Sequence, residues 1–191
     1  MRDAALASIP RRHRMPATPC LFDAVVFDLD GTLVATDRFW IDAARVGARR
    51  AYAELGLDRP MPTAAEWMSL VGLPLAQGFA RLFPDLEPRV RARVMELCEE
   101  EEHKALRSGG AALLPGVAET LTDLRARGIR LGIASNCGRE YLASMMGDLG
   151  LAAWIEEGRC LDSPGISSKS DMVADLLERF GTRSAVMVGD R

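Results

Sequence analysis

Cysteine and histidine are scarce in this sequence, and their spacing forms no familiar ligand set. Four cysteines and two histidines occur among 191 residues, and no two cysteines stand as a Cys-x-x-Cys pair. A structural zinc site and a disulfide framework are therefore not expected. Sparse, unpaired cysteines are typical of a protein whose thiols stay reduced, so we expect a cytoplasmic location.

The sequence also lacks an excess of positive charge and any long apolar run. Its 24 basic and 27 acidic residues leave a net charge of −3, which gives no reason to expect nucleic acid or a membrane as a partner. No stretch approaches the roughly 18 apolar residues of a membrane span. The basic, proline-rich start has no apolar centre like that of a signal peptide, so residues 1–19 are predicted to form a flexible tail.

The sequence pattern alternates between short apolar runs, typical of strands, and amphipathic segments, typical of helices. The run Ala24–Phe27 is apolar and rich in β-branched residues, as expected of a strand buried on both faces. Similar strands are predicted within "IRLGIAS" and "SAVMVGDR", and a shorter one in "AAWIEEG". Strands that alternate with helices predict an α/β fold with a Rossmann-like parallel sheet core.

One segment, residues 37–108, contains helical patterns only. Apolar residues recur at helical spacing between Trp40 and Leu55, and Thr63–Glu66 has the spacing of a capping box. A long amphipathic pattern follows, whose acidic run Glu99–Glu102 is expected to be a solvated face. The segment is therefore predicted to be an α-helical cap domain inserted into the core.

The core itself is predicted to be discontinuous, made of residues 20–36 and 109–191, because the first strand cannot stand by itself. In such sheets the ligand lies outside the carboxyl ends of the strands. Polar residues fall at these ends or just beyond them, at Asp28 and Asp30, at Ser135 and Asn136, at Lys169 and at Asp190. Each alone has an ordinary explanation as a helix cap, a turn residue or a surface residue. Their convergence predicts an active site.

Asp28 and Asp30 would repel each other there and carry a desolvation cost. A bound divalent cation relieves both effects, and oxygen ligands without histidine or thiolate favour Mg²⁺. Asp190 supplies a third carboxylate, so these three aspartates are the candidate metal ligands. The alternative is that the first two are capping or turn acids. Gly31 and Thr32 follow at once and are candidate phosphate ligands, because glycine allows the backbone amides to approach an anion closely.

Ser135, Asn136 and Lys169 complete the candidate phosphate site. A cation at a helix start is slightly unfavourable by itself, which indicates an anionic partner for Lys169. Together the residues predict phosphoryl transfer, with Asp28 as the nucleophile that forms an aspartyl-phosphate. Asp30 would protonate the leaving alkoxide and later take a proton from water. Mg²⁺, Ser135 and Lys169 would neutralise the non-bridging oxygens.

Four motifs stand in order along the chain: "FDLDGTL", "ASN" at a strand end, Lys169 at a helix start, and "VMVGDR". They resemble the four motifs of the haloacid dehalogenase-like hydrolase superfamily. The helical segment after the first motif resembles a C1-type cap, and "LLPGVAETLTDLRARGIRLGIASN" is very similar to the phosphoglycolate phosphatase-like members. The resemblance implies Asp28 as nucleophile and metal ligand, and Asp30 as acid and base with its backbone carbonyl on Mg²⁺. It also implies that Ser135 and Lys169 bind phosphate and that Asp190 binds the metal.

Dehalogenases of this superfamily lack the second aspartate, so the resemblance implies a Mg²⁺-dependent phosphatase that acts on a small phosphorylated metabolite. A sugar phosphomutase similar to β-phosphoglucomutase shares the motifs and is the alternative. Family members continue past the fourth motif, whereas this sequence stops at Arg191, so the C-terminal end of the core is expected to be missing. An inactive truncated fragment is then a third possibility, with Ala185–Val188 as an exposed apolar edge. Nothing in the sequence indicates the oligomeric state.

Overall fold

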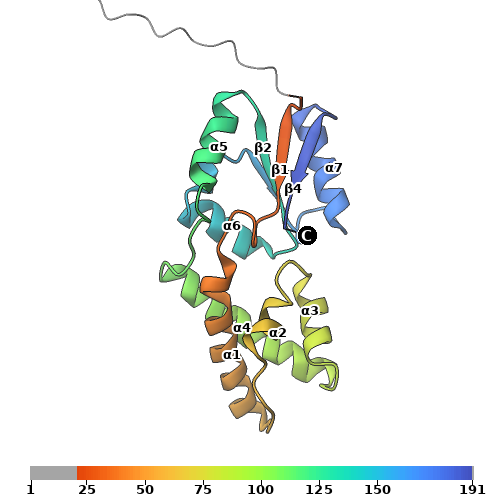
Figure 1. The fold of residues 1–191 in the computed structure, drawn as a ribbon. Helices are drawn as coiled ribbons and strands as arrows, with labels where there is room; N and C mark the ends of the chain where they lie inside the picture. The colour runs from red at the N-terminus through yellow and green to blue at the C-terminus, as the bar shows by residue number, and fades with distance from the viewer. Residues whose placement is uncertain (1–20, 191) are drawn as a thin grey trace, which may run out of the picture.

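The computed structural model describes residues 21–190, and the tail predicted for residues 1–19 lies outside this range (Figure 1). A four-stranded sheet forms the core, with the order β3-β2-β1-β4 and every neighbouring pair parallel. The strands are β1 (Ala24–Phe27), β2 (Arg130–Ala134), β3 (Glu157–Arg159) and β4 (Ala185–Val188). The predicted α/β class with a parallel sheet is therefore confirmed.

Helices cover both faces of the sheet, because successive strand residues face two different apolar layers. The core helices are α5 (Val117–Ala126), α6 (Arg139–Asp148) and α7 (Lys169–Phe180). Ala24 and Val26 of β1 share one apolar cluster with the buried side chains of α7. Val25 and Phe27 belong to the larger cluster, which includes the buried side chains of α5 and α6. All four residues of β1 are buried, as predicted for a strand at the centre of the sheet.

The prediction of a strand in "AAWIEEG" is wrong for the first residues of this segment. Leu151–Ala153 form a short 3-10 helix, and only Glu157–Arg159 pair with β2. Gly150 precedes this turn with a positive φ of 65° and reverses the chain after α6. Periodicity cannot separate a short apolar strand from a buried turn. At the other edge, β4 exposes its apolar residues Val186–Val188, as predicted.

Four helices form a lobe on the side of the sheet where β1 ends (Figure 1). They are α1 (Trp40–Leu55), α2 (Ala64–Met68), α3 (Leu75–Leu82) and α4 (Pro88–Arg107). Gly47 permits α1 and α4 to cross closely, since a Cβ at Gly47 would stand 2.5 Å from the Cα of Cys98. The ring of Trp67 lies with its centroid 5.9 Å from that of Phe83 inside the lobe. Within residues 21–190, no helix has both the length and the apolar character that crossing a bilayer demands.

The two chain segments that join the lobe to the core lie side by side. The backbone amide of Ala35 donates to the carbonyl of Ala112 at 2.9 Å, and the amide of Leu114 donates to the carbonyl of Leu33 at 2.9 Å. Val34 and Leu113 form an antiparallel bridge between these bonds. The chain therefore enters and leaves the lobe through one hydrogen-bonded pair of segments.

Candidate active site

Asp28 lies directly after β1 and is only 6% exposed. Its Oδ2 accepts a hydrogen bond from Lys169 Nζ at 2.5 Å, and its Oδ1 accepts one from the backbone amide of Leu29 at 2.8 Å. Lys169 is the first residue of α7, so the parallel topology brings together two predicted positions that are 141 residues apart. The ion pair compensates the buried negative charge of Asp28.

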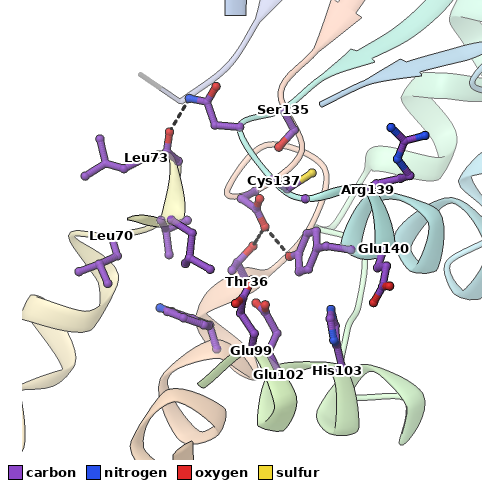
Figure 2. A pocket seen from close by; sticks show the side chains of 18 of the residues that line it. Thr36, Leu70, Leu73, Glu99, Glu102, His103, Ser135, Cys137, Arg139 and Glu140 are labelled. Atoms are coloured by element: carbon purple, nitrogen blue, oxygen red, sulfur yellow. Dashed lines mark hydrogen bonds between the residues drawn. The ribbon is translucent and has the colours of Figure 1, made fainter. Parts of the chain in front are cut away.

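Asp30 points into a cavity and is held by two hydroxyl groups. Its Oδ1 accepts hydrogen bonds from Thr36 Oγ1 at 2.7 Å and from the hydroxyl of Tyr141 at 2.6 Å, drawn as dashed lines in Figure 2. Burial raises the pKa of Asp30, the two hydrogen bonds oppose this rise, and the charge of Asp28 adds to it. A carboxyl group that keeps its proton more firmly is suited to donate it to a leaving group.

Asp190 follows β4, which is paired directly with β1. Its carboxylate lies against Gly31, because a Cβ on that glycine would stand 2.8 Å from Asp190 Oδ2. The absence of a side chain at Gly31 thus lets a further carboxylate approach the loop that begins at Asp28. The fourth predicted motif therefore meets the first at the carboxyl ends of two neighbouring strands.

The donor set at these strand ends fits Mg²⁺. In the described part of the chain, no three His, Cys, Asp or Glu side chains are grouped as a metal site, and the side chain of Asp30 is bound to Thr36 and Tyr141 instead. Mg²⁺ commonly takes only one or two carboxylates and completes its shell with water and phosphate oxygens. Asp28 and Asp190 can provide those carboxylates, and Asp30 can contribute its backbone carbonyl.

The loop after Asp28 closes on itself. The amide of Gly31 donates to the carbonyl of Val34 at 3.0 Å, and that of Thr32 donates to the carbonyl of Leu29 at 3.3 Å. The hydroxyl of Thr32 is buried and has no hydrogen-bond partner among the described residues. Neither residue lines the cavity. The structure uses the amides of Gly31 and Thr32 to shape the turn, and their contact with phosphate stays a prediction.

A cavity of about 450 Å³ lies between the sheet and the helical lobe. Its walls come from α4, from the segment between α2 and α3, and from the segment between β2 and α6 (Figure 2). Asp30, Ser135 and Asn136 line it, and the other predicted site residues lie outside its lining. A cavity of this size is typical of a small-molecule site.

Ser135 and Asn136 follow β2, at the same edge of the sheet. Ser135 is 2% exposed, and its amide donates to the carbonyl of Arg159 at 3.0 Å. The side-chain amide of Asn136 donates to the carbonyl of Gly72 at 2.9 Å (Figure 2). Asn136 therefore connects the sheet to the helical lobe in this structure, and its contact with phosphate stays a prediction.

The prediction that Glu99–Glu102 form a solvated face is wrong in part. Glu100 and Glu101 form ion pairs with Arg50, but Glu99 and Glu102 line the cavity. Their spacing of three residues places them on one face of α4, and this signal was present in the sequence. Which face of α4 meets the cavity depends on how the lobe packs against the core. The sequence pattern does not show this packing.

Comparison with known proteins connects this chain with one family. A model of the haloacid dehalogenase-like hydrolases matches residues 25–191. An uncharacterized protein in the fgs 3' region of Lacticaseibacillus casei is 31% identical over 133 residues, and a phosphoglycolate phosphatase of Salmonella typhi is 26% identical over 144 residues. These matches cover 69% and 68% of this chain, which spans 57% of the length of each relative.

The fold also has close counterparts among solved structures. The crystal structure of a predicted phosphoglycolate phosphatase from Haemophilus somnus 129PT superposes on this chain with a TM-score of 0.74 and 21% identity. The match covers 90% of this chain and 78% of that one. At this level of identity the likeness shows a shared fold.

Proposed function

The chain belongs to the haloacid dehalogenase-like hydrolase family, and from that premise we propose that it is a Mg²⁺-dependent phosphatase that hydrolyses a small phosphomonoester. The contrast between two neighbouring carboxyl groups carries the proposal. Asp28 is in an ion pair with Lys169, whereas Asp30 is a partly buried, hydroxyl-bound carboxyl group whose pKa is raised. Carboxyl groups in such different environments can take the separate parts of nucleophile and proton donor.

In the first step, an oxygen of Asp28 would attack phosphorus while the bond from phosphorus to the alcohol oxygen breaks. The carboxyl group of Asp30 would give its proton to the departing alkoxide. The substrate phosphate would compete with Asp28 for Lys169, and this exchange would free the carboxylate oxygen for attack. The products of the step are the free alcohol and an aspartyl-phosphate at Asp28.

In the second step, water would attack the phosphorus of the aspartyl-phosphate while Asp30 takes a proton from it. The bond from phosphorus to the Asp28 oxygen breaks, and inorganic phosphate leaves. Ser135 and Lys169, which lie near the carboxyl ends of the strands, would hold the non-bridging oxygens through both steps. A bound Mg²⁺ would neutralise part of the phosphate charge.

The protein is expected to release inorganic phosphate from 4-nitrophenyl phosphate in the presence of Mg²⁺ and to lose this activity in EDTA, because two carboxylates and a phosphate dianion repel one another without a cation. Thermal unfolding in both buffers shows whether the metal-free protein is still folded. Adding Mg²⁺ back should restore the rate. Equal rates in both buffers would contradict the metal requirement, and folded protein without turnover in either buffer would overturn the proposed function.

Replacing Tyr141 with phenylalanine is expected to lower kcat roughly 3- to 10-fold and to shift its pH profile. The hydroxyl of Tyr141 stabilises the charged form of Asp30 and so lowers its pKa. Its removal raises that pKa further. Because the first step needs protonated Asp30, the rate falls as pH rises through this pKa, and the falling limb should move to higher pH.

The measurement is kcat against pH with 2-hydroxyethyl phosphate, because its alkoxide needs a proton on leaving whereas 4-nitrophenolate does not. Tyr52→Phe is the matched control, since it removes a buried tyrosine hydroxyl outside the cavity. A lower melting temperature with an unchanged pH profile would show that Tyr141 serves packing alone.

A further inference from the structure

The cavity beside Asp30 is lined by more acidic than basic side chains. Its other acidic residues are Glu99, Glu102, Glu140 and Asp162, and its basic residues are His103 and Arg139. The guanidinium of Arg139 donates to the backbone carbonyl of Asp162, whose carboxylate accepts the backbone amide of Arg139 at 2.8 Å. Arg139 and Asp162 carry one charge of each sign without forming an ion pair, and among the remaining lining residues the acidic side chains outnumber the basic one.

The carboxylates of α4 have cationic partners on its outer side only. Glu100 and Glu101 pair with Arg50, and Glu101 also pairs with Lys104. Glu99 and Glu102 rise from the helix into the cavity toward Thr36 (Figure 2). Within residues 21–190, no side chain forms a hydrogen bond or an ion pair with the carboxylate of either one. The inner face of α4 therefore carries acidic groups that the protein does not neutralise.

The titration of these two groups agrees with this shortage of positive charge. Burial, together with the charges of Asp30 and Glu99, raises the pKa of Glu102 to about 8. Burial and neighbouring acidic groups also raise the pKa of Glu99. A cation bound between them would favour the ionised form of both carboxyl groups, because opposite charges at close range stabilise each other.

We propose that the cavity recognises a primary ammonium group on the alcohol part of the substrate, with Glu99 and Glu102 as the residues that determine this specificity. The inference rests on the proposed phosphatase activity and names its substrate class. The phosphate would meet Lys169 and the metal ligands at the strand ends, and the ammonium group would meet α4 across the cavity. An ester with a carboxylate in place of the ammonium group would bring a further acidic group to a helix face that offers it no cation.

Three phosphate esters of matched size test the proposal: 2-aminoethyl phosphate, 2-hydroxyethyl phosphate and phosphoglycolate. They present an ammonium, a hydroxyl and a carboxylate group at nearly the same distance from phosphorus. The expected order of kcat/KM is ammonium, then hydroxyl, then carboxylate, with roughly 100-fold between the first and the last. Hydrolysis of 4-nitrophenyl phosphate by the same preparation serves as the reference activity.

Variants of α4 assign the effect to named residues. Glu99→Gln and Glu102→Gln should each reduce the preference for the ammonium ester over the carboxylate ester by roughly 10-fold. Glu100→Gln is the control, because Glu100 lies on the same helix and outside the cavity lining. Thermal unfolding of each variant shows that a lost preference is not lost folding.

The outcomes separate the two proposals. If the protein hydrolyses 4-nitrophenyl phosphate but prefers phosphoglycolate, or treats the three esters alike, the ammonium site is overturned while the phosphatase proposal stands. The same holds if the preference persists in the Glu99→Gln/Glu102→Gln double variant. If folded protein hydrolyses none of the four esters, the proposed function fails and the ammonium site falls with it.

Discussion

Replacing Asp28 with asparagine is expected to lower phosphate release from 4-nitrophenyl phosphate by roughly 10³-fold or more. The amide of asparagine is a poor nucleophile, and it cannot form the acyl phosphate through which the reaction would pass. The fold should survive, because the carbonyl oxygen of asparagine can still accept the amide of Leu29, which now bonds to Asp28 Oδ1 at 2.8 Å. Lys169 would lose its ionic partner, but its side chain is 30% exposed and can be solvated.

The measurement is the rate of phosphate release by folded protein at saturating Mg²⁺, with the melting temperature as a check on folding. Asp37→Asn is a suitable control, since Asp37 is an exposed aspartate near the site that does not line the cavity. If the Asp28→Asn variant kept more than roughly a tenth of the wild-type rate, the nucleophile would have to be another group.

Replacing Lys169 with methionine is expected to reduce both activity and stability. The rate should fall by roughly 10²-fold, because the substrate phosphate loses a charged partner. The free energy of unfolding should fall by roughly 1–3 kcal/mol, because the carboxylate of Asp28 stays buried with no cation beside it. The loss is expected in EDTA, where no metal ion can take the place of the lysine.

A double variant separates the ion pair from other effects of the methionine. Asp28→Asn/Lys169→Met removes both charges, so its stability should recover toward that of the wild type. Lys104→Met serves as the control, because Lys104 is 53% exposed in its ion pair with Glu101 and such pairs contribute only about 0–1 kcal/mol. Urea unfolding of the wild type, the two single variants at Asp28 and Lys169 and the double variant gives the coupling free energy of the ion pair. A Lys169→Met protein as stable as the wild type would contradict a compensated buried charge at Asp28.

The sequence pattern predicted the residues whose place depends on the sheet. Asp28, Ser135 and Asp190 each come directly after a strand or within two residues of one, and parallel strands bring their carboxyl ends to one edge. Lys169 is predicted on another ground, because a cation at the start of a helix indicates an anionic partner. Local apolar patterns are sufficient to locate the strand ends, because a buried parallel strand has a continuous apolar sequence.

The residues that surround Asp30 could not be predicted in the same way. Helical spacing predicts Tyr141 as a packing residue, and it is 7% exposed, but its hydroxyl reaches an aspartate 111 residues earlier. Glu99 and Glu102 have their place only because α4 presents one particular face to the cavity. These contacts depend on how the helical lobe is set against the sheet. The apolar periodicity of a single helix does not indicate how that helix is placed relative to the sheet.

The paired segments at Val34 and Leu113 give the molecule a modular construction. Because the chain leaves the core and returns to it through two hydrogen-bonded neighbours, the backbone joins the lobe to the core at one place, and other contacts between them, such as that of Asn136 with Gly72, are non-covalent. An insert of another length or sequence could start and finish at the same two positions without moving β1. The lobe, which we propose selects the alcohol, can therefore change while the strand ends, which we propose handle the phosphate, stay as they are.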